Sequence, residues 1–244
     1  MIDFLKLSSV WGVALTLVAF ALGTFLHRKT KAAWCNPLLL GSIFVIVLLS
    51  VLKIPYPEYK GSASALTWLL FPATVSLAIP LYEQWELLKK NVLAIFAGIS
   101  AGVITGVGSI LLLAWLFRLD AASAVSLLPK SVTTAIGVDV STELGGIPAL
   151  TTAVIILTGI VGNLLVVSLC KLLRITNPIA KGIAIGTSSH AIGTSKALEI
   201  GQVEGAMSSL SIAVAGILTA IACPTVAHLL PMQQLWCSSG AGFP

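Results

Sequence analysis

Charged residues are unevenly spaced along the chain and leave long stretches that are almost entirely apolar. Five stretches approach or exceed the roughly 20 residues that an α-helix needs to cross a bilayer. They are residues 8–26, 37–54, 91–117, 146–170 and 205–230. Residues 64–82 are also uncharged, but we expect Pro72 and Pro80 to interrupt them, because proline kinks a helix. The pattern predicts an all-α, polytopic membrane protein.

Two shorter segments between the apolar stretches are polar. Residues 124–142 contain Pro129 and Gly137, and residues 179–200 contain Gly186 and Gly193, so we predict a broken helix in each segment. Irregular backbone at membrane depth is tolerated only where it faces protein or a wet cavity. The two segments are therefore the first candidates for a polar site inside the membrane.

The polar segments share a repeated pattern. Residues 135–145 read Ala-Ile-Gly, five residues, then Glu-Leu-Gly, and residues 191–201 read Ala-Ile-Gly, five residues, then Glu-Ile-Gly. A weaker copy, Ala-Ile-Pro, five residues, then Glu-Leu, occupies residues 78–87. The copies start 57 and then 56 residues apart. Internal repeats around broken helices are typical of transporters, so they favour passage of a small polar solute over anchoring.

The composition indicates that lipid is the solvent. The chain is 57% hydrophobic and 9% charged, whereas a soluble domain carries about 25% charged residues. The net charge of +5 comes without any nucleic-acid motif, so the basic residues are interpreted as flanks of membrane spans. Residues 233–244 are predicted to be a disordered tail. The cysteines lack metal-ligand or redox spacing and are interpreted as packing residues: Cys35, Cys170, Cys223 and Cys237.

Basic clusters at residues 27–31, 89–90 and 171–174 predict three cytoplasmic ends under the positive-inside rule. Segment 124–142 is then expected to enter and leave the membrane from the outer face. Segment 179–200 is expected to enter and leave it from the cytoplasm, so that consecutive repeats are inverted. If both segments cross instead, the repeats are parallel. In either case residues 1–60 form a two-span region, and residues 61–232 form a transport core built from the repeats.

Lys130 is the candidate for recognising a carboxylate. It is followed by Ser131, Thr133 and Thr134, whose hydroxyls, with the free amides of the break, predict a cradle for an anion. If Pro129 opens a short helix, the end of that helix adds partial positive charge. The alternative is an interfacial lysine that reaches the lipid headgroups. The adjacent hydroxyls and the break favour the binding role.

The second polar segment is rich in small hydroxyl residues and glycine. We predict that Ser188, Ser189, His190 and Thr194 bind the remaining polar atoms of the solute. His190 is also a candidate proton relay, because histidine changes charge near neutral pH. The alternatives are hydroxyl residues that only mediate helix packing and a histidine that is only a buried packing residue.

Charged residues also lie close to the breaks. Lys196 and Glu199 are three positions apart, so we predict that they pair on one helix face. An ionised group at the bilayer centre costs about 3 kcal/mol or more, so each must be paired, wetted, protonated or interfacial. We assign Asp139 and Glu143 to the interface. Glu199 and Glu204 join His190 as candidates for proton coupling.

The sequence gives little support to an enzyme. It has no His-Glu-x-x-His motif, no P-loop and no dinucleotide fingerprint. Three scattered histidines do not supply a metal site, and we expect no cofactor.

At these motifs the chain resembles the LrgB/CidB family of bacterial inner-membrane proteins. The specific motifs are Leu-Pro-Lys-Ser-Val-Thr at residues 128–133 and Ser-His-Ala-x-Gly-Thr at residues 189–194. One departure is Ala135-Ile136, where many relatives have Pro-Ile, and we expect it to change the helix geometry only locally. The resemblance covers about residues 35–225; its other matching stretches are 36–39, 71–75, 80–82, 145–149 and 204–210.

The resemblance implies one of two functions, or both. The family was first named for antiholin-like control of murein hydrolase activity and cell lysis, alongside a small holin-like LrgA/CidA partner. Relatives are also linked to transport of small monocarboxylates, namely pyruvate in bacteria and glycolate and glycerate in plastids. The residues favour transport, because the family motifs coincide with the broken, charged repeats. We expect a homodimer in the bacterial inner membrane, and a water-filled channel is a third alternative.

Overall fold

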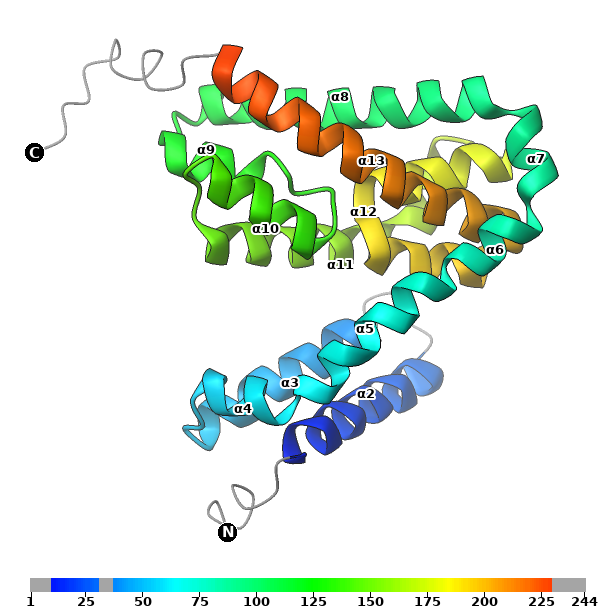
Figure 1. Ribbon diagram of the computed structural model, residues 1–244. Coiled ribbons are helices and arrows are strands. Elements are labelled where there is room, and N and C mark those ends of the chain that lie inside the picture. Colours follow the sequence, from blue (N-terminus) through cyan, green and yellow to red (C-terminus); the bar gives the residue numbers. More distant parts are fainter. Residues whose placement is uncertain (1–9, 31–36, 230–244) are drawn as a thin grey trace, which may run out of the picture. The chain divides into compact units, whose positions relative to one another are not determined.

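The computed structural model describes residues 10–30 and 37–229 of the 244-residue chain. Every element in these residues is a helix, which confirms the predicted all-α class (Figure 1). The chain divides into two compact units, Met1–Leu77 and Ala78–Pro244. The predicted tail 233–244 lies outside the described residues, as do Cys35 and Cys237.

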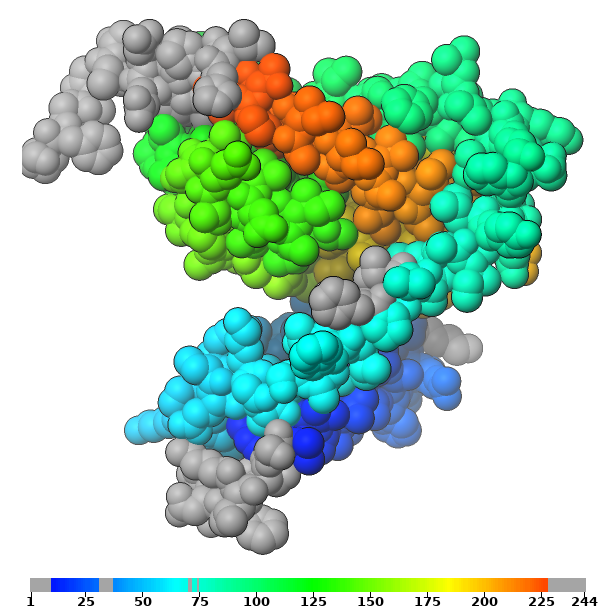
Figure 2. All heavy atoms as spheres, in the orientation of Figure 1, coloured from blue at the N-terminus to red at the C-terminus, as the bar shows by residue number. Residues whose placement is uncertain are grey.

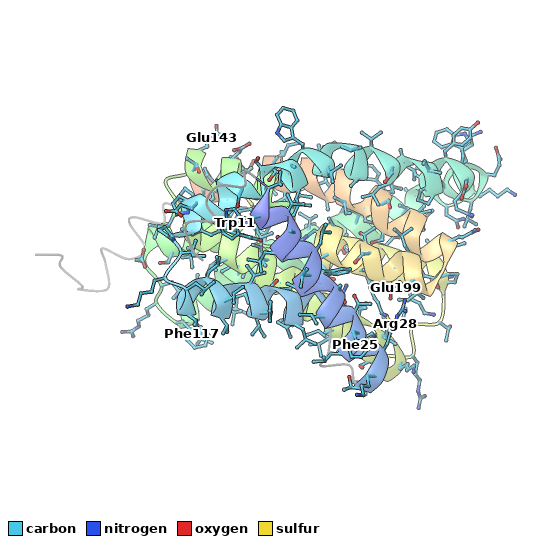
Figure 3. The ribbon with its side chains drawn as sticks, turned by 90° about the horizontal axis from the view of Figure 1, so that it is seen from below. Trp11, Phe25, Arg28, Phe117, Glu143 and Glu199 are labelled. Atoms are coloured by element: carbon cyan, nitrogen blue, oxygen red, sulfur yellow. The ribbon has the colours of Figure 1, made fainter. Side chains whose placement is uncertain are left out.

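Unit 1 contains helices α2 (Trp11–Thr30), α3 (Pro37–Val51), α4 (Tyr56–Ser62) and α5 (Ser64–Ser76). Helices α2 and α3 pack closely, since a Cβ added at Gly41 would lie 3.5 Å from the backbone of Ala19. The hydroxyls of Thr16 and Tyr59 share a hydrogen bond of 2.7 Å that joins α2 to α4. Figure 3 shows Trp11 and Arg28 towards opposite ends of α2, where aromatic and basic residues suit the membrane interfaces.

Unit 2 begins with two short helices and continues with longer ones around the polar segments. Its helices are α6 (Ala78–Glu83), α7 (Trp85–Lys90), α8 (Val92–Leu116), α9 (Ala121–Leu127), α10 (Thr134–Glu143), α11 (Pro148–Leu172), α12 (Pro178–Ile200) and α13 (Gln202–Leu229).

Four helices in the described residues are long and apolar enough to cross a membrane, namely α2, α8, α11 and α13. They coincide with four of the five predicted spans. The fifth, residues 37–54, forms α3 of 15 residues, about 22 Å long against roughly 30 Å of hydrocarbon. Large apolar side chains such as Leu93, at 85% exposure, face outward. These surfaces require lipid, so the chain is a membrane protein.

The core of unit 2 is built on one face of α8. Ile95, Ile99, Val103 and Val107 recur every four residues, are buried, and pack in one cluster with residues of α12 and α13. Helix α13 lies in a band between α9–α10 and α6–α8 on the face shown in Figure 2. This cluster fixes α8, α12 and α13, the elements around both polar segments.

The breaks in the polar segments lie at residues 128–133 and at His190. The predicted breaks at Gly137, Gly186 and Gly193 are wrong, since all three glycines are helical. They serve close packing instead: a Cβ at Gly186 would lie 2.7 Å from the Cβ of Ser211. Pro72 also lies inside a helix, α5, and the interruption of segment 64–82 falls at Leu77.

Helices α8 and α11 run in opposite directions in Figure 1, and each has 25 residues. Helices α9 and α10 lie at the end of unit 2 where α8 ends and α11 begins, whereas α12 bends back toward the start of α13. The first residues of α8 and α11, Val92 and Pro148, are 56 positions apart. The inverted repeat and the re-entrant course of both segments nevertheless stay predictions until the sides of the membrane are assigned.

Candidate functional site

The turn between α9 and α10 holds Lys130. The amide of Lys130 donates to the Leu127 carbonyl at 3.1 Å, and the amide of Val132 donates to the Pro129 carbonyl at 3.3 Å. Helix α10 begins only at Thr134, so the expectation that Pro129 opens a helix is wrong. Two amides of the predicted anion cradle are therefore used within the turn, which leaves side chains as the main donors.

Lys130 and Ser131 line a pocket of about 760 Å³ between α8, the turn 128–133 and the first half of α12. The Lys130 Nζ donates to the Ser131 Oγ at 3.1 Å. Thr187 and Ser188 of α12 line the same pocket. Lys130 is the one charged residue among the described residues that line it. The two predicted polar segments thus meet at a single cavity with one positive charge.

Helix α8 forms the other wall through small and hydroxyl residues. Gly98, Gly102 and Gly106 follow one another every four residues and line the pocket with Thr105 and Ser109. A Cβ added at Gly102 would lie 3.0 Å from the Thr187 Oγ1, so glycine lets α12 approach α8. This close approach shapes the pocket and brings the Thr187 hydroxyl to α8.

The break in α12 is centred on His190, whose backbone has φ 42° and ψ −141°. A non-glycine residue rarely adopts this conformation, so surrounding contacts must hold it. The imidazole is buried and its Nε2 donates to the Ile155 carbonyl of α11 at 2.9 Å. Because a carbonyl only accepts, Nε2 carries the hydrogen. Gly159 makes room for the ring, since a Cβ there would lie 2.7 Å from its Cε1.

Further hydrogen bonds hold the residues that follow the break. The Thr194 hydroxyl donates to the His190 carbonyl at 2.9 Å and shares a 2.7 Å hydrogen bond with the Ser208 hydroxyl of α13. The Asn163 side-chain amide of α11 donates to the Ile192 carbonyl at 2.8 Å. Three helices therefore hold the break in place, as buried polar backbone requires.

The predicted solute-binding residues thus divide into two groups. Lys130, Ser131 and Ser188 line the pocket. The other five do not line it. Thr133 occupies the N-cap position of α10 without a side-chain cap hydrogen bond, Thr134 begins that helix, and Ser189, His190 and Thr194 are buried on α12.

The predicted proton-coupling acids lie away from the pocket of Lys130. Glu199 pairs with Lys196 at 2.7 Å, which confirms the predicted pair, and its side chain is 66% exposed. Glu204 is nearly buried at the start of α13, with its Oε1 4.0 Å from the Lys181 Nζ. Figure 3 shows Glu143 at the α9–α10 end of unit 2 and Glu199 on α12, away from that end.

Sequence reasoning missed Thr187, although it directly precedes the predicted Ser188, and missed the polar residues of α8. Thr105 and Ser109 lie inside an apolar span, where only their spacing of three and seven residues from the glycines signals a shared face. Residues 98–102 also have the Gly-x-Ser-x-Gly spacing of a nucleophile elbow. That motif requires a sharp strand-to-helix turn, whereas these residues lie within the continuous helix α8.

Comparisons with known proteins agree on one family. Residues 16–229 match the LrgB-like family. The antiholin-like protein LrgB of Bacillus subtilis (strain 168) is 37% identical over 225 residues, which cover 92% of this chain and 97% of that protein. The antiholin-like protein LrgB of Bacillus mycoides (strain KBAB4) is 36% identical over 88% of this chain and 94% of that protein. No solved structure matches the chain. The chain therefore belongs to the LrgB-like family.

Proposed function

We propose that this chain binds a small monocarboxylate anion of the pyruvate, glycolate or lactate class and passes it across the membrane. The observation that carries the proposal is the pocket in which Lys130 is the single charged residue among the described residues of the lining. Charge-assisted hydrogen bonds to a carboxylate are about twice as strong as neutral ones. The Ser131 hydroxyl accepts from Lys130 and can donate its own hydrogen to a further oxygen atom of such an anion. The Thr187 and Ser188 hydroxyls donate to the carbonyls of Ile183 and Ala184 at 2.7 Å, so they must rotate before they can donate to the anion.

The roles of the remaining predicted residues follow from their positions. We assign Thr194 to support of the break at His190, because its hydroxyl bonds to the His190 carbonyl and to the Ser208 hydroxyl. Thr133, Thr134 and Ser189 do not line the pocket and are given no contact with the solute. Of the predicted proton carriers, Glu204 is better placed than Glu199, because it is nearly buried whereas Glu199 is exposed and paired. If neither these acids nor His190 carries a proton, passage is facilitated diffusion.

A second candidate is antiholin-like control of cell lysis in the bacterial inner membrane, together with a holin-like LrgA/CidA partner. The comparisons favour this candidate more strongly than transport, because the relatives found are named antiholin-like proteins. The pocket favours transport, because a chain that acts only by binding a partner protein does not need a lysine in a pocket between its helices. The candidates are compatible if passage of the anion is how the chain acts on lysis.

Paired assays separate these functions. Uptake of radiolabelled pyruvate is measured in proteoliposomes that hold the wild type, Lys130→Ala or Lys90→Ala, where Lys90 is an exposed lysine at the end of α7. We expect saturable uptake that Lys130→Ala abolishes and Lys90→Ala preserves. Full activity of Lys130→Ala would contradict the carboxylate role, and uptake that never saturates would indicate a channel.

The same variants are then expressed in bacterial cells with the holin-like partner, and lysis is followed. Loss of lysis control in Lys130→Ala alone would link the pocket to the antiholin-like role. If all variants control lysis and the wild type takes up no pyruvate, the antiholin-like function is supported and the transport function is contradicted.

A further inference from the structure

We propose that unit 2 carries a second site, for the headgroup of an anionic phospholipid, at the junction of α11 and α12. The site is a pocket of about 520 Å³ that is separate from the pocket of Lys130. Its described lining residues include no acid. They combine three basic residues with aliphatic ones, among them Lys171, Arg174, Lys181, Val167, Ile175 and Ile200.

The positive charge of this pocket is only partly neutralised. The Lys181 Nζ lies 4.0 Å from Glu204, which is a long ion pair. Neither Lys171 nor Arg174 forms an ion pair with another described residue. Two exposed cations beside a weakly paired third attract an anion, and the planar guanidinium of arginine suits a phosphate in particular.

The backbone fixes Arg174 beside Lys171. The amide of Arg174 donates to the Lys171 carbonyl at 3.2 Å, and the amide of Ile175 donates to the Cys170 carbonyl at 2.9 Å. These bonds form a Schellman motif at the end of α11, in which Arg174 has φ 54° where glycine is usual. Arg118 follows the end of α8 in the same conformation, with φ 50°. It is therefore a matched control for Arg174.

The surroundings favour a lipid over a soluble anion. Leu172 and Leu173, between the two basic residues, are 76% and 65% exposed. They end a helix long enough to cross the membrane, so the pocket lies where headgroups meet acyl chains. The phosphate of an anionic phospholipid would contact the cations while its acyl chain follows the aliphatic wall. A soluble phosphate would use the cations alone.

The test uses the purified full chain in a neutral detergent and follows thermal unfolding. Dioctanoyl phosphatidylglycerol is compared with dioctanoyl phosphatidylcholine and with glycerol phosphate. We expect phosphatidylglycerol to raise the melting temperature more than the other two. Lys171→Gln and Arg174→Gln should each weaken the apparent affinity for phosphatidylglycerol about fivefold. Lys171→Arg and Arg118→Gln should retain the wild-type response, and Glu204→Gln should strengthen it because Lys181 loses its acid.

Equal shifts with phosphatidylglycerol and phosphatidylcholine would overturn the proposal. So would an unchanged response in the double variant Lys171→Gln/Arg174→Gln, after its helical circular dichroism has been checked. If glycerol phosphate reproduces the whole shift, the pocket binds a soluble anion and the assignment to a lipid is wrong. None of these outcomes depends on transport through the pocket of Lys130.

Discussion

At the scale of single residues, Lys130 and His190 illustrate two uses of a polar group at a helix break. Lys130 lines an open pocket. Its Nζ donates a hydrogen bond to the hydroxyl of the neighbouring Ser131. His190 is buried and bonded to a backbone carbonyl of the next helix. Of the two interpretations of His190, the geometry favours a packing residue that stabilises the break over a proton relay.

We predict that His190→Ala destabilises the protein by about 1–3 kcal/mol, because the buried imidazole and its hydrogen bond to Ile155 are lost. Thermal unfolding in detergent measures the change. His190→Gln, which retains a donor near the position of Nε2, should recover part of the stability. A His190→Ala protein that keeps wild-type stability but loses uptake would instead support a direct role of His190 in transport.

At the scale of elements, the apolar spans and the existence of a break in each polar segment were predictable, but of the predicted break positions only Pro129 falls in an observed break. Length and hydropathy specify α8, α11 and α13, because a charge-free run of this length has few other stable environments. A glycine inside such a run signals either a break or a close approach, and the sequence alone does not separate them. Gly186 and Gly193 serve packing, whereas the break occurs at His190, where contacts with α11 and α13 override local preference.

The close approach of α12 to α8 at Gly102 shapes the pocket of Lys130. We expect Gly102→Ala to reduce pyruvate uptake, because its Cβ would lie 3.0 Å from the Thr187 Oγ1 and would displace a wall of the pocket. Gly108→Ala, on the same helix, adds a Cβ that meets no atom within 4 Å and should leave uptake unchanged. Proteoliposome assays of the two variants measure the difference, and equal activities would argue against a pocket shaped by this contact.

At the scale of the whole molecule, the course of α12 decides between inverted and parallel repeats. Helix α11, at about 37 Å, is long enough to cross the membrane, so its ends should lie on opposite sides. The break at His190 divides α12 into residues 178–189 and 191–200, about 18 Å and about 15 Å long, and each part is too short to cross separately. If α12 turns back, Glu199 lies on the side where α11 ends, opposite Glu143.

We therefore predict that cysteines placed at residues 143 and 199, in a protein without its native cysteines, react with an impermeant maleimide from opposite sides. Both side chains are exposed, so their access does not depend on unfolding. Labelling is compared in sealed vesicles of known orientation. Reaction of Glu143→Cys and Glu199→Cys from the same side would mean that α12 crosses the membrane and would overturn the inverted arrangement.

The lining of the pocket was only partly predictable from the sequence, because some of its residues lie inside an apolar span. Lys130, Ser131 and Ser188 stand out because polar residues in a broken apolar segment need a partner or water. Thr105 and Ser109 do not stand out, because small hydroxyl residues are common in membrane helices and pack without function. Only the fold shows that α8 turns them toward the same cavity as Lys130.

Equilibrium binding of pyruvate measures whether the pocket of Lys130 holds a small monocarboxylate. Radiolabelled pyruvate is titrated onto the purified full chain, with Lys130→Ala and Lys90→Ala beside the wild type. We predict saturable binding that excess glycolate or lactate displaces, unchanged in Lys90→Ala and at least about tenfold weaker in Lys130→Ala. Equal affinity in all three proteins, or no saturable binding by folded wild-type protein, would show that the pocket of Lys130 is not a monocarboxylate site.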